Sequence, residues 1–103
     1  MKFLVEVRIP TESGNKGIMD GTLMQQMQSY LGEVKPETVY FALAHGKRTV
    51  YMVVNIPAAE KMVEIAEPLW LDWNAEVYAT PVMDQAAFEK AGAGIERIVR
   101  ARK

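Results

Sequence analysis

The sequence predicts an α+β domain with elements in the order βαββαβ. A four-stranded antiparallel sheet is expected, with two long helices on one face and an extra helix at the C-terminus. Three observations predict this class. Two runs rich in β-branched and aromatic residues flank the pair His45-Gly46, as in a β-hairpin. Two further runs, near the two ends of the chain, alternate apolar and polar residues as half-buried strands do. The segments between these strands carry apolar residues at helical spacing.

Bulk properties indicate one small globular domain covering residues 1–103. Half of the residues are hydrophobic and 24% are charged, which is ordinary for a soluble protein. The net charge of −1 provides no basic field for nucleic acid. Charges interrupt the apolar N-terminal run, so it does not resemble a signal peptide, and no run is long enough to span a membrane. The absence of cysteine fits a cytoplasmic protein and excludes disulfides and thiolate chemistry.

The N-terminal half is expected to hold one strand and one helix. Residues Lys2 to Ile9 alternate as a strand that Pro10 ends. The segment TESGNKG, residues 11–17, is a loop, or a loop that runs into a helix start at Ser13 or Asn15, and the helix that follows ends near Gly32. Its apolar stripe consists of Leu23, Met24, Met27, Tyr30 and Leu31.

The hairpin that follows has a predicted register. Its strands run over Thr38–Ala44 and Arg48–Val54, with His45-Gly46 as the loop, so Tyr40 pairs with Tyr51. This register separates the side chains cleanly into two faces, and a slip of one residue would mix them. One face carries Val39, Phe41, Leu43, Val50, Met52 and Val54, and the other carries Tyr40, Ala42, Tyr51 and Val53.

The C-terminal half is expected to hold a helix, a strand and a final helix. The first helix begins at Ile56-Pro57, and Pro68 should break or kink it at about Glu67. A strand covers Ala75 to Val82, and Asp84 caps the final helix. The apolar stripe of the final helix consists of Phe88, Ala91, Gly92, Ile95, Ile98 and Val99.

This order of elements is the split βαβ, or ferredoxin-like, arrangement. Right-handed crossovers place the first and third strands in the centre of the sheet and both long helices on one face. The face beneath the helices is aliphatic. It collects Phe3, Val5, Val7, Val39, Phe41, Leu43, Val50, Met52, Val54, Val77 and Ala79.

The opposite sheet face is too aromatic for open solvent and too polar for a simple interior. It collects Leu4, Glu6, Arg8, Tyr40, Ala42, Tyr51, Val53 and Tyr78. A second copy of the chain is the expected cover, since large exposed apolar patches on monomers are uncommon. The candidate dimer-face residues are Glu6, Arg8, Tyr40, Tyr51 and Tyr78. Two alternatives stay open: a monomer whose final helix folds over this face, and a ligand cavity in which Glu6 and Arg8 are polar anchors.

A second set of candidates could line a ligand pocket, and consists of Asp20, Glu67, Trp70, Asp72 and Trp73. Two tryptophans beside a proline form a pocket wall or, alternatively, plug one end of the core. Asp20 and Thr22 also fit a helix-start pair. His45, the only histidine, is expected to be a solvated turn residue. No cofactor or metal is predicted, because the glycines match no phosphate-binding fingerprint and no ligand cluster has metal-binding spacing.

Several stretches resemble the dimeric α+β barrel superfamily of small ferredoxin-like domains, and within it an uncharacterised bacterial family of about this length. The likeness extends over nearly the whole chain, and the stretches that carry it are markers of fold and not catalytic motifs. The stretches are MKFLVEVRIP at the N-terminus, DGTL at Asp20–Leu23, KPETVYF at Lys35–Phe41, GKRTVYMVV at Gly46–Val54, AEPLWL at Ala66–Leu71 and NAEVYATPVM at Asn74–Met83.

The resemblance implies a homodimer and constrains activity weakly, because the superfamily includes cofactor-free monooxygenases, lactone isomerases, haem proteins and stress-response proteins. The haem branch needs an axial histidine, which a hairpin tip does not suit. Three functions fit: a homodimeric small-molecule-binding domain, a cofactor-free enzyme of isomerase or monooxygenase type, and a pure assembly module. The enzyme would need an enclosed pocket between helices and sheet. The sequence assigns no catalytic residue.

Overall fold

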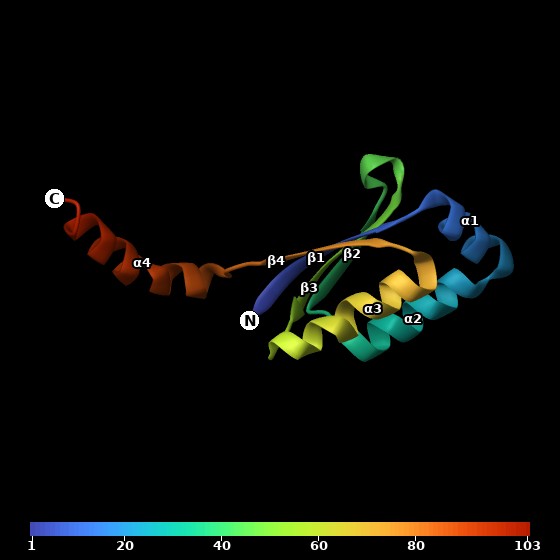
Figure 1. Cartoon of the computed structure of the whole chain (residues 1–103), viewed down its shortest axis with the longest axis horizontal. Coiled ribbons are helices and arrows are strands. Elements are labelled where there is room, and N and C mark those ends of the chain that lie inside the picture. Colours follow the sequence, from blue (N-terminus) through green and yellow to red (C-terminus); the bar gives the residue numbers. More distant parts are fainter.

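The computed structural model describes residues 1–103 and contains one sheet, with helices α2 and α3 on the same side of it (Figure 1). The chain runs through β1 (Lys2–Ile9), α1 (Thr11–Asp20), α2 (Thr22–Val34), β2 (Thr38–Ala42), β3 (Arg48–Asn55), α3 (Met62–Trp73), β4 (Glu76–Pro81) and α4 (Gln85–Arg100). No helix is both long enough and apolar enough to cross a lipid bilayer.

The sheet has the order β2-β3-β1-β4, and every neighbouring pair is antiparallel. The predicted α+β class is therefore confirmed, with the first and third strands in the centre. Each connection that crosses the sheet contains a helix on the same face. The other face of the sheet is consequently left without a covering element.

The hairpin register is confirmed, but β2 ends at Ala42 and not at the predicted Ala44, and a short 3-10 turn covers Ala44–Gly46. Tyr40 pairs with Tyr51, and the N–H of Lys47 donates to the carbonyl oxygen of Ala44 at 3.1 Å. His45 has φ 58° and Gly46 has φ 72°, so both turn residues adopt the left-handed region that a tight hairpin turn requires. A glycine at the second position lowers the strain of this conformation.

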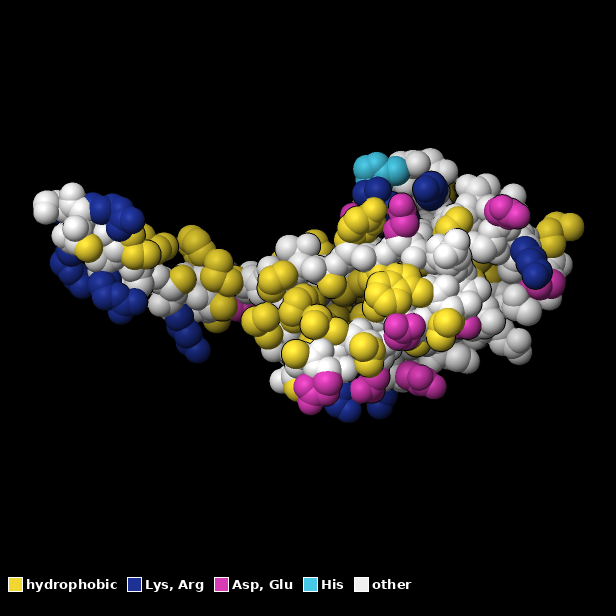
Figure 2. Space-filling view, in the orientation of Figure 1, with side chains coloured by type: hydrophobic (Ala, Val, Ile, Leu, Met, Phe, Trp, Pro, Cys, Tyr) yellow, Lys and Arg dark blue, Asp and Glu magenta, His cyan; other side chains and the backbone are white.

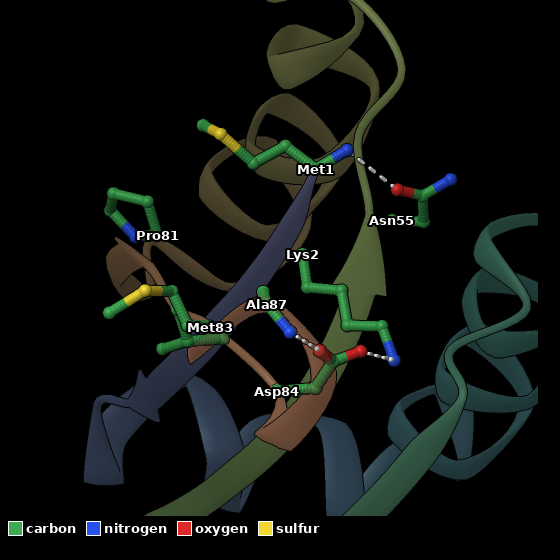
Figure 3. Close-up of a pocket in the computed structure, with 8 residues that line it drawn as sticks. Met1, Lys2, Asn55, Pro81, Met83, Asp84 and Ala87 are labelled. Atoms are coloured by element: carbon green, nitrogen blue, oxygen red, sulfur yellow. Dashed lines mark hydrogen bonds and ion pairs between the residues drawn. The ribbon is translucent and has the colours of Figure 1, made fainter. Parts of the chain in front are cut away.

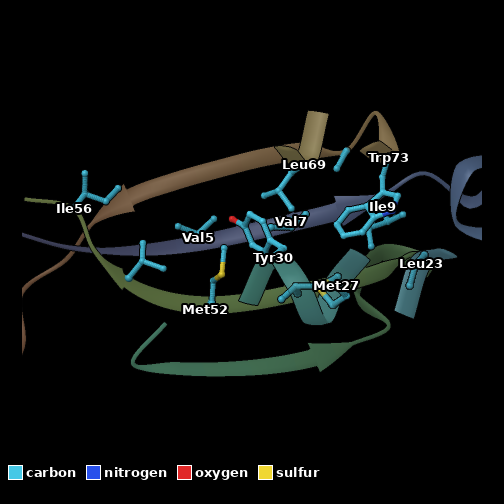
Figure 4. Packing of buried hydrophobic residues seen from close by; sticks show 13 residues of the cluster. Val5, Val7, Ile9, Leu23, Met27, Tyr30, Met52, Ile56, Leu69 and Trp73 are labelled. Atoms are coloured by element: carbon cyan, nitrogen blue, oxygen red, sulfur yellow. The ribbon is translucent and has the colours of Figure 1, made fainter. Parts of the chain in front are cut away.

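The core lies between the helices and the two central strands (Figure 4). It consists of Val5, Val7, Ile9, Leu23, Met27, Tyr30, Val50, Met52, Val54, Ile56, Leu69, Trp73 and Ala75. The phenol of Tyr30 donates to the carbonyl oxygen of Ile65 at 2.7 Å and so links α2 to α3. Methionine and leucine side chains occupy the space between helices and sheet in which an enzyme would need an enclosed pocket.

The predicted first helix is wrong in its continuity, because the structure has two helices there. The chain breaks at Gly21, whose φ is 78°, and α2 then continues past Gly32 to Val34. The positive φ at Gly21 allows the turn between α1 and α2. Nothing forces a stop at Gly32, because a glycine lowers helix stability without preventing helical geometry.

Of the two outcomes expected at Pro68, a break or a kink, the break is wrong, since α3 passes through this residue. Proline removes one helical hydrogen bond, but the residues that follow are strongly anchored. Leu69 and Trp73 are both buried in the core. Their burial holds the last turn of α3 in place.

Part of the predicted aliphatic face is uncovered. Phe41 and Leu43 remain exposed, and Leu43 keeps 83% of its surface. They lie at the edge strand and hairpin tip, beside an open groove that α2 borders. Alternation assigns a side chain to a face, but the position of the helices decides whether it is covered.

Helix α4 projects away from the rest of the chain (Figure 1). The predicted N-cap is confirmed: the Asp84 carboxylate accepts the N–H of Ala87 at 2.8 Å. None of its residues is buried, and the molecule measures 62 × 27 × 20 Å. The radius of gyration is 17.4 Å, whereas a compact chain of this length has about 13 Å. The alternative in which the final helix folds over the open sheet face is not observed.

Candidate functional site

A straight row of side chains crosses all four strands on the open sheet face. Tyr40 on β2 pairs with Tyr51 on β3, Tyr51 pairs with Glu6 on β1, and Glu6 pairs with Tyr78 on β4. The predicted dimer-face tyrosines therefore form one continuous row with a carboxylate inside it. Alternation along each strand places these side chains on one face, and the pairing register aligns them.

Two parallel rows flank the tyrosine row. On one side lie Thr38, Val53, Leu4 and Thr80, and on the other lie Ala42, Thr49, Arg8 and Glu76. Most of these side chains are shorter than tyrosine. The aromatic row therefore stands between two rows of mainly smaller residues.

The charged centre of the face is an ion pair between Arg8 and Glu6, two residues apart on β1. The Arg8 guanidinium also lies 4.9 Å from the centre of the Tyr78 ring, at cation–π distance. The hydrogen bond to Glu6 raises the pKa of Arg8, so the guanidinium remains cationic. The pair carries no net charge, and it places a planar cation beside an aromatic ring.

The tyrosines on the edge strands remain accessible. Tyr40 keeps 68% of its surface and Tyr78 keeps 46%, whereas Tyr51 on a central strand is half-buried. Leu4 in the flanking row is also exposed. The face therefore offers aromatic and aliphatic surface around a charged pair.

Asp20, a predicted pocket residue, caps the start of α2. Its carboxylate accepts the backbone N–H of Thr22 at 2.9 Å and the Thr22 hydroxyl at 2.6 Å. The Thr22 hydroxyl and then its backbone N–H lower the pKa of Asp20. This geometry corresponds to a helix-start pair, and Asp20 does not reach the other pocket candidates.

The remaining pocket candidates lie on different sides of α3. Trp73 is buried, and its ring N–H donates to the amide oxygen of Gln26 at 3.0 Å. Trp70 is half-exposed on another side, Glu67 is exposed, and Asp72 lines a groove of about 400 Å³ between α2 and α3. The structure does not bring these four side chains together around one space.

A groove that the sequence did not indicate lies at the base of α4 (Figure 3). It has a volume of about 530 Å³, and its polar atoms bond to one another. Lys2 pairs with Asp84 at 3.4 Å and with Glu37 at 3.0 Å. The Met1 amino group donates to the Asn55 side chain at 2.8 Å. These contacts fix the base of α4.

A second unanticipated groove lies between α2 and β2, with a volume of about 550 Å³. Ten of its thirteen lining residues are hydrophobic, among them Met24, Leu31 and Phe41. The hydrophobic residues of the hairpin were the only sequence feature that could have indicated this groove. The sequence could not show that α2 lies beside them.

His45 lies at the hairpin tip, and no group of three or more His, Cys, Asp or Glu residues is placed to hold a metal ion. Compared with protein-family models and with curated proteins, the sequence matches none of them. The open-face row is therefore the best-defined candidate site of the chain.

Proposed function

We propose that the protein is a homodimer that binds a small planar molecule between the open sheet faces of its two copies. The observation that carries the proposal is the row of Tyr40, Tyr51, Glu6 and Tyr78 on a face that nothing covers. Exposed apolar and aromatic surface of this kind is typical of interaction sites. The resemblance to the dimeric α+β barrel superfamily supports the same pairing.

The face suits a second copy because it is electrically balanced. Glu6 and Arg8 cancel each other, so two identical faces would not repel through these groups. In a two-fold arrangement each patch meets itself, and Arg8 of one copy can approach Glu6 of the other. The tyrosine rings supply large contact area with few rotatable bonds.

The same side chains suit a planar aromatic acid as the ligand. Packed sheets lie about 10 Å apart, so short side chains beside a tyrosine row leave space for a flat molecule. Tyrosine rings would stack against it, and the Arg8 guanidinium would receive its carboxylate. The filled core and the engaged Glu6 provide no argument for catalysis.

Dimerisation is tested with Tyr40→Asp and its neighbour Phe41→Asp. Both replaced side chains are exposed aromatics on β2, but they lie on opposite sheet faces. By light scattering at about 10 μM, we expect wild type and Phe41→Asp to have twice the chain mass of 11.6 kDa. We expect Tyr40→Asp to raise the dissociation constant of the dimer at least about tenfold. A monomeric wild type, or a Tyr40→Asp dimer of unchanged affinity, would contradict the proposal.

Ligand binding is tested with benzoate-type acids in a thermal-shift series. A ligand that binds only the native state at 100 times its Kd stabilises it by about 2.7 kcal/mol. We expect such acids to raise the Tm of wild type but not of Arg8→Gln. Lys16→Gln, which removes a cation from α1, is the control and should respond like wild type.

A further inference from the structure

Helix α4 carries an apolar stripe that its own chain leaves uncovered. Phe88, Ile95, Ile98 and Val99 are all about half-exposed. Figure 2 shows hydrophobic side chains along one side of this helix, with Lys and Arg side chains along the other side and around its C-terminal end. With 16 residues, α4 is only just longer than the roughly 12–15 residues below which an isolated helix is marginal in water, and Gly92 and Gly94 weaken it further. Its stability therefore calls for a packing surface.

The base of α4 points the helix away from its own chain. The N–H of Val82 donates to the carbonyl oxygen of Lys2 at 3.0 Å, so pairing with β1 continues just beyond β4. Asp84 then binds Lys2 and caps α4 through Ala87 (Figure 3). Only Met83 separates these two anchored residues. Short hinges of this kind favour exchange of an element between copies over its return to its own chain.

The charges identify what kind of surface α4 fits. Residues 85–103 contain five cationic and two acidic side chains, a net charge of +3, whereas residues 1–84 contain seven cationic and eleven acidic side chains, a net charge of −4. Two α4 helices would repel each other, but α4 and the acidic remainder of a second copy attract. The expected partner is therefore a second copy, contacted through its body.

The outer flank of α3 provides the matching surface. Val63, Ala66 and Trp70 are spaced three and four residues apart, so they share one side of the helix. Pro68 and Asp72 face α2 across a groove, which places this apolar side away from α2. Val63 is exposed and Trp70 keeps 47% of its surface. Hydrophobic side chains gather over α3 and β4 beside the base of α4 (Figure 2).

Unpaired charges adjoin both surfaces. Glu67 lies one turn from Val63 and Trp70, and it has no ion-pair partner in the chain. Arg97 and Arg100 near the end of α4 have none either. The apolar groove between α2 and β2 fits less well, because the charged residue that lines it is the cation Arg48.

We propose that α4 is an exchanged arm: in a two-fold dimer, the α4 of each chain lays its apolar stripe on the Val63–Trp70 flank of α3 in the second copy. This contact does not involve the open sheet face, so it stands or falls separately from the proposed ligand site.

Hydrogen exchange followed by mass spectrometry on the full chain measures directly whether the backbone amides of α4 are protected. In wild type we expect the amides of α4 to exchange at least about tenfold more slowly at 100 μM than at 1 μM. Ile95→Asp should abolish this protection, and Ala93→Asp, on the opposite side of α4, should keep it. On α3, Trp70→Glu should abolish the protection, and its neighbour Leu71→Glu should keep it.

A mixture decides whether docking is between copies. The Ile95→Asp chain has an intact flank and the Trp70→Glu chain has an intact arm, so mixing them should restore protection in α4 of the Trp70→Glu chain alone. The two α4 peptides differ in mass and are followed separately. Strong protection that is independent of concentration means docking on the same chain, and no protection at any concentration means an uncovered arm. Loss of protection with Met24→Glu but not with Trp70→Glu means that α4 docks in the α2–β2 groove and not on α3. Each of these three results overturns the proposal.

Discussion

At the scale of single residues, Tyr30 connects the two helices that cover the sheet. Its ring packs in the core (Figure 4), and its hydroxyl donates to the carbonyl oxygen of Ile65 on α3. Burial raises the pKa of this phenol above its ordinary value of 10.0. The folded state therefore keeps Tyr30 protonated at pH values where an unfolded chain would release its proton.

Tyr30→Phe should lower the free energy of unfolding at pH 7 by about 1 kcal/mol, the net value of one hydrogen bond. The pH dependence has a definite sign. Because the folded-state pKa is raised, the contribution is complete below about pH 10 and is lost as the pH rises through the folded-state pKa. Urea unfolding between pH 8 and 11 should show a shallower decline for Tyr30→Phe than for wild type. Tyr40→Phe, at an exposed position, should decline like wild type, and equal slopes in all three proteins would refute the argument.

The residues of the open face could be predicted, whereas those of the supposed pocket could not. Alternation along a strand assigns Glu6, Arg8 and the tyrosines to one face without further information. A helical stripe is less restrictive, because the sheet can meet α3 on more than one side. Trp70 and Trp73 look alike in the sequence, but only packing against the sheet decides that Trp73 is buried.

At the scale of elements, two glycines near the two ends of α2 have opposite roles. Gly21 adopts φ 78° between α1 and α2, while Gly32 lies inside α2 with open space where a side chain would extend. The sequence suggested the reverse, with Gly32 as the stop. Local propensity alone cannot distinguish them, since the packing of α1 against the start of α2 selects the site of the turn.

Alanine substitutions at these glycines should therefore have opposite effects. Gly21→Ala forces a residue with a Cβ into the left-handed region and should lower the free energy of unfolding by about 1–2 kcal/mol. Gly32→Ala should raise it by about 0.5–1 kcal/mol, because alanine is the better helix former and meets no neighbour. Guanidinium denaturation of both variants measures the difference. Effects of the same sign would mean that the turn does not depend on Gly21.

At the scale of the whole molecule, charge is divided between an acidic body and a cationic arm, with net charges of −4 and +3. The overall net charge of −1 conceals this division. An exchanged arm would neutralise much of the charge on each body. Association would then depend on salt as well as on apolar contact.

Raising the salt concentration from 0.1 to 1 M should weaken arm docking several-fold, since the screening length falls from about 10 to about 3 Å. The measurement is the protein concentration at which the α4 amides become half-protected from hydrogen exchange. Glu67→Gln should reduce this salt dependence, and Glu12→Gln, on α1, should leave it unchanged. Docking that strengthens with salt in every variant would show that apolar contact alone drives it.

The sequence by itself determined the order of elements, the hairpin register and the two faces of the sheet. These features follow from alternation, turn chemistry and connection rules, which act over short stretches of chain. Only the tertiary structure decided that the tyrosines and Glu6 form one row, that α3 passes through Pro68, and that α4 projects outward. These outcomes depend on contacts between distant segments: strand pairing, burial of Leu69 and Trp73, and the link from Lys2 to Asp84. A periodic pattern shows that a surface needs a cover, but only the arrangement in space shows that the chain itself does not supply one.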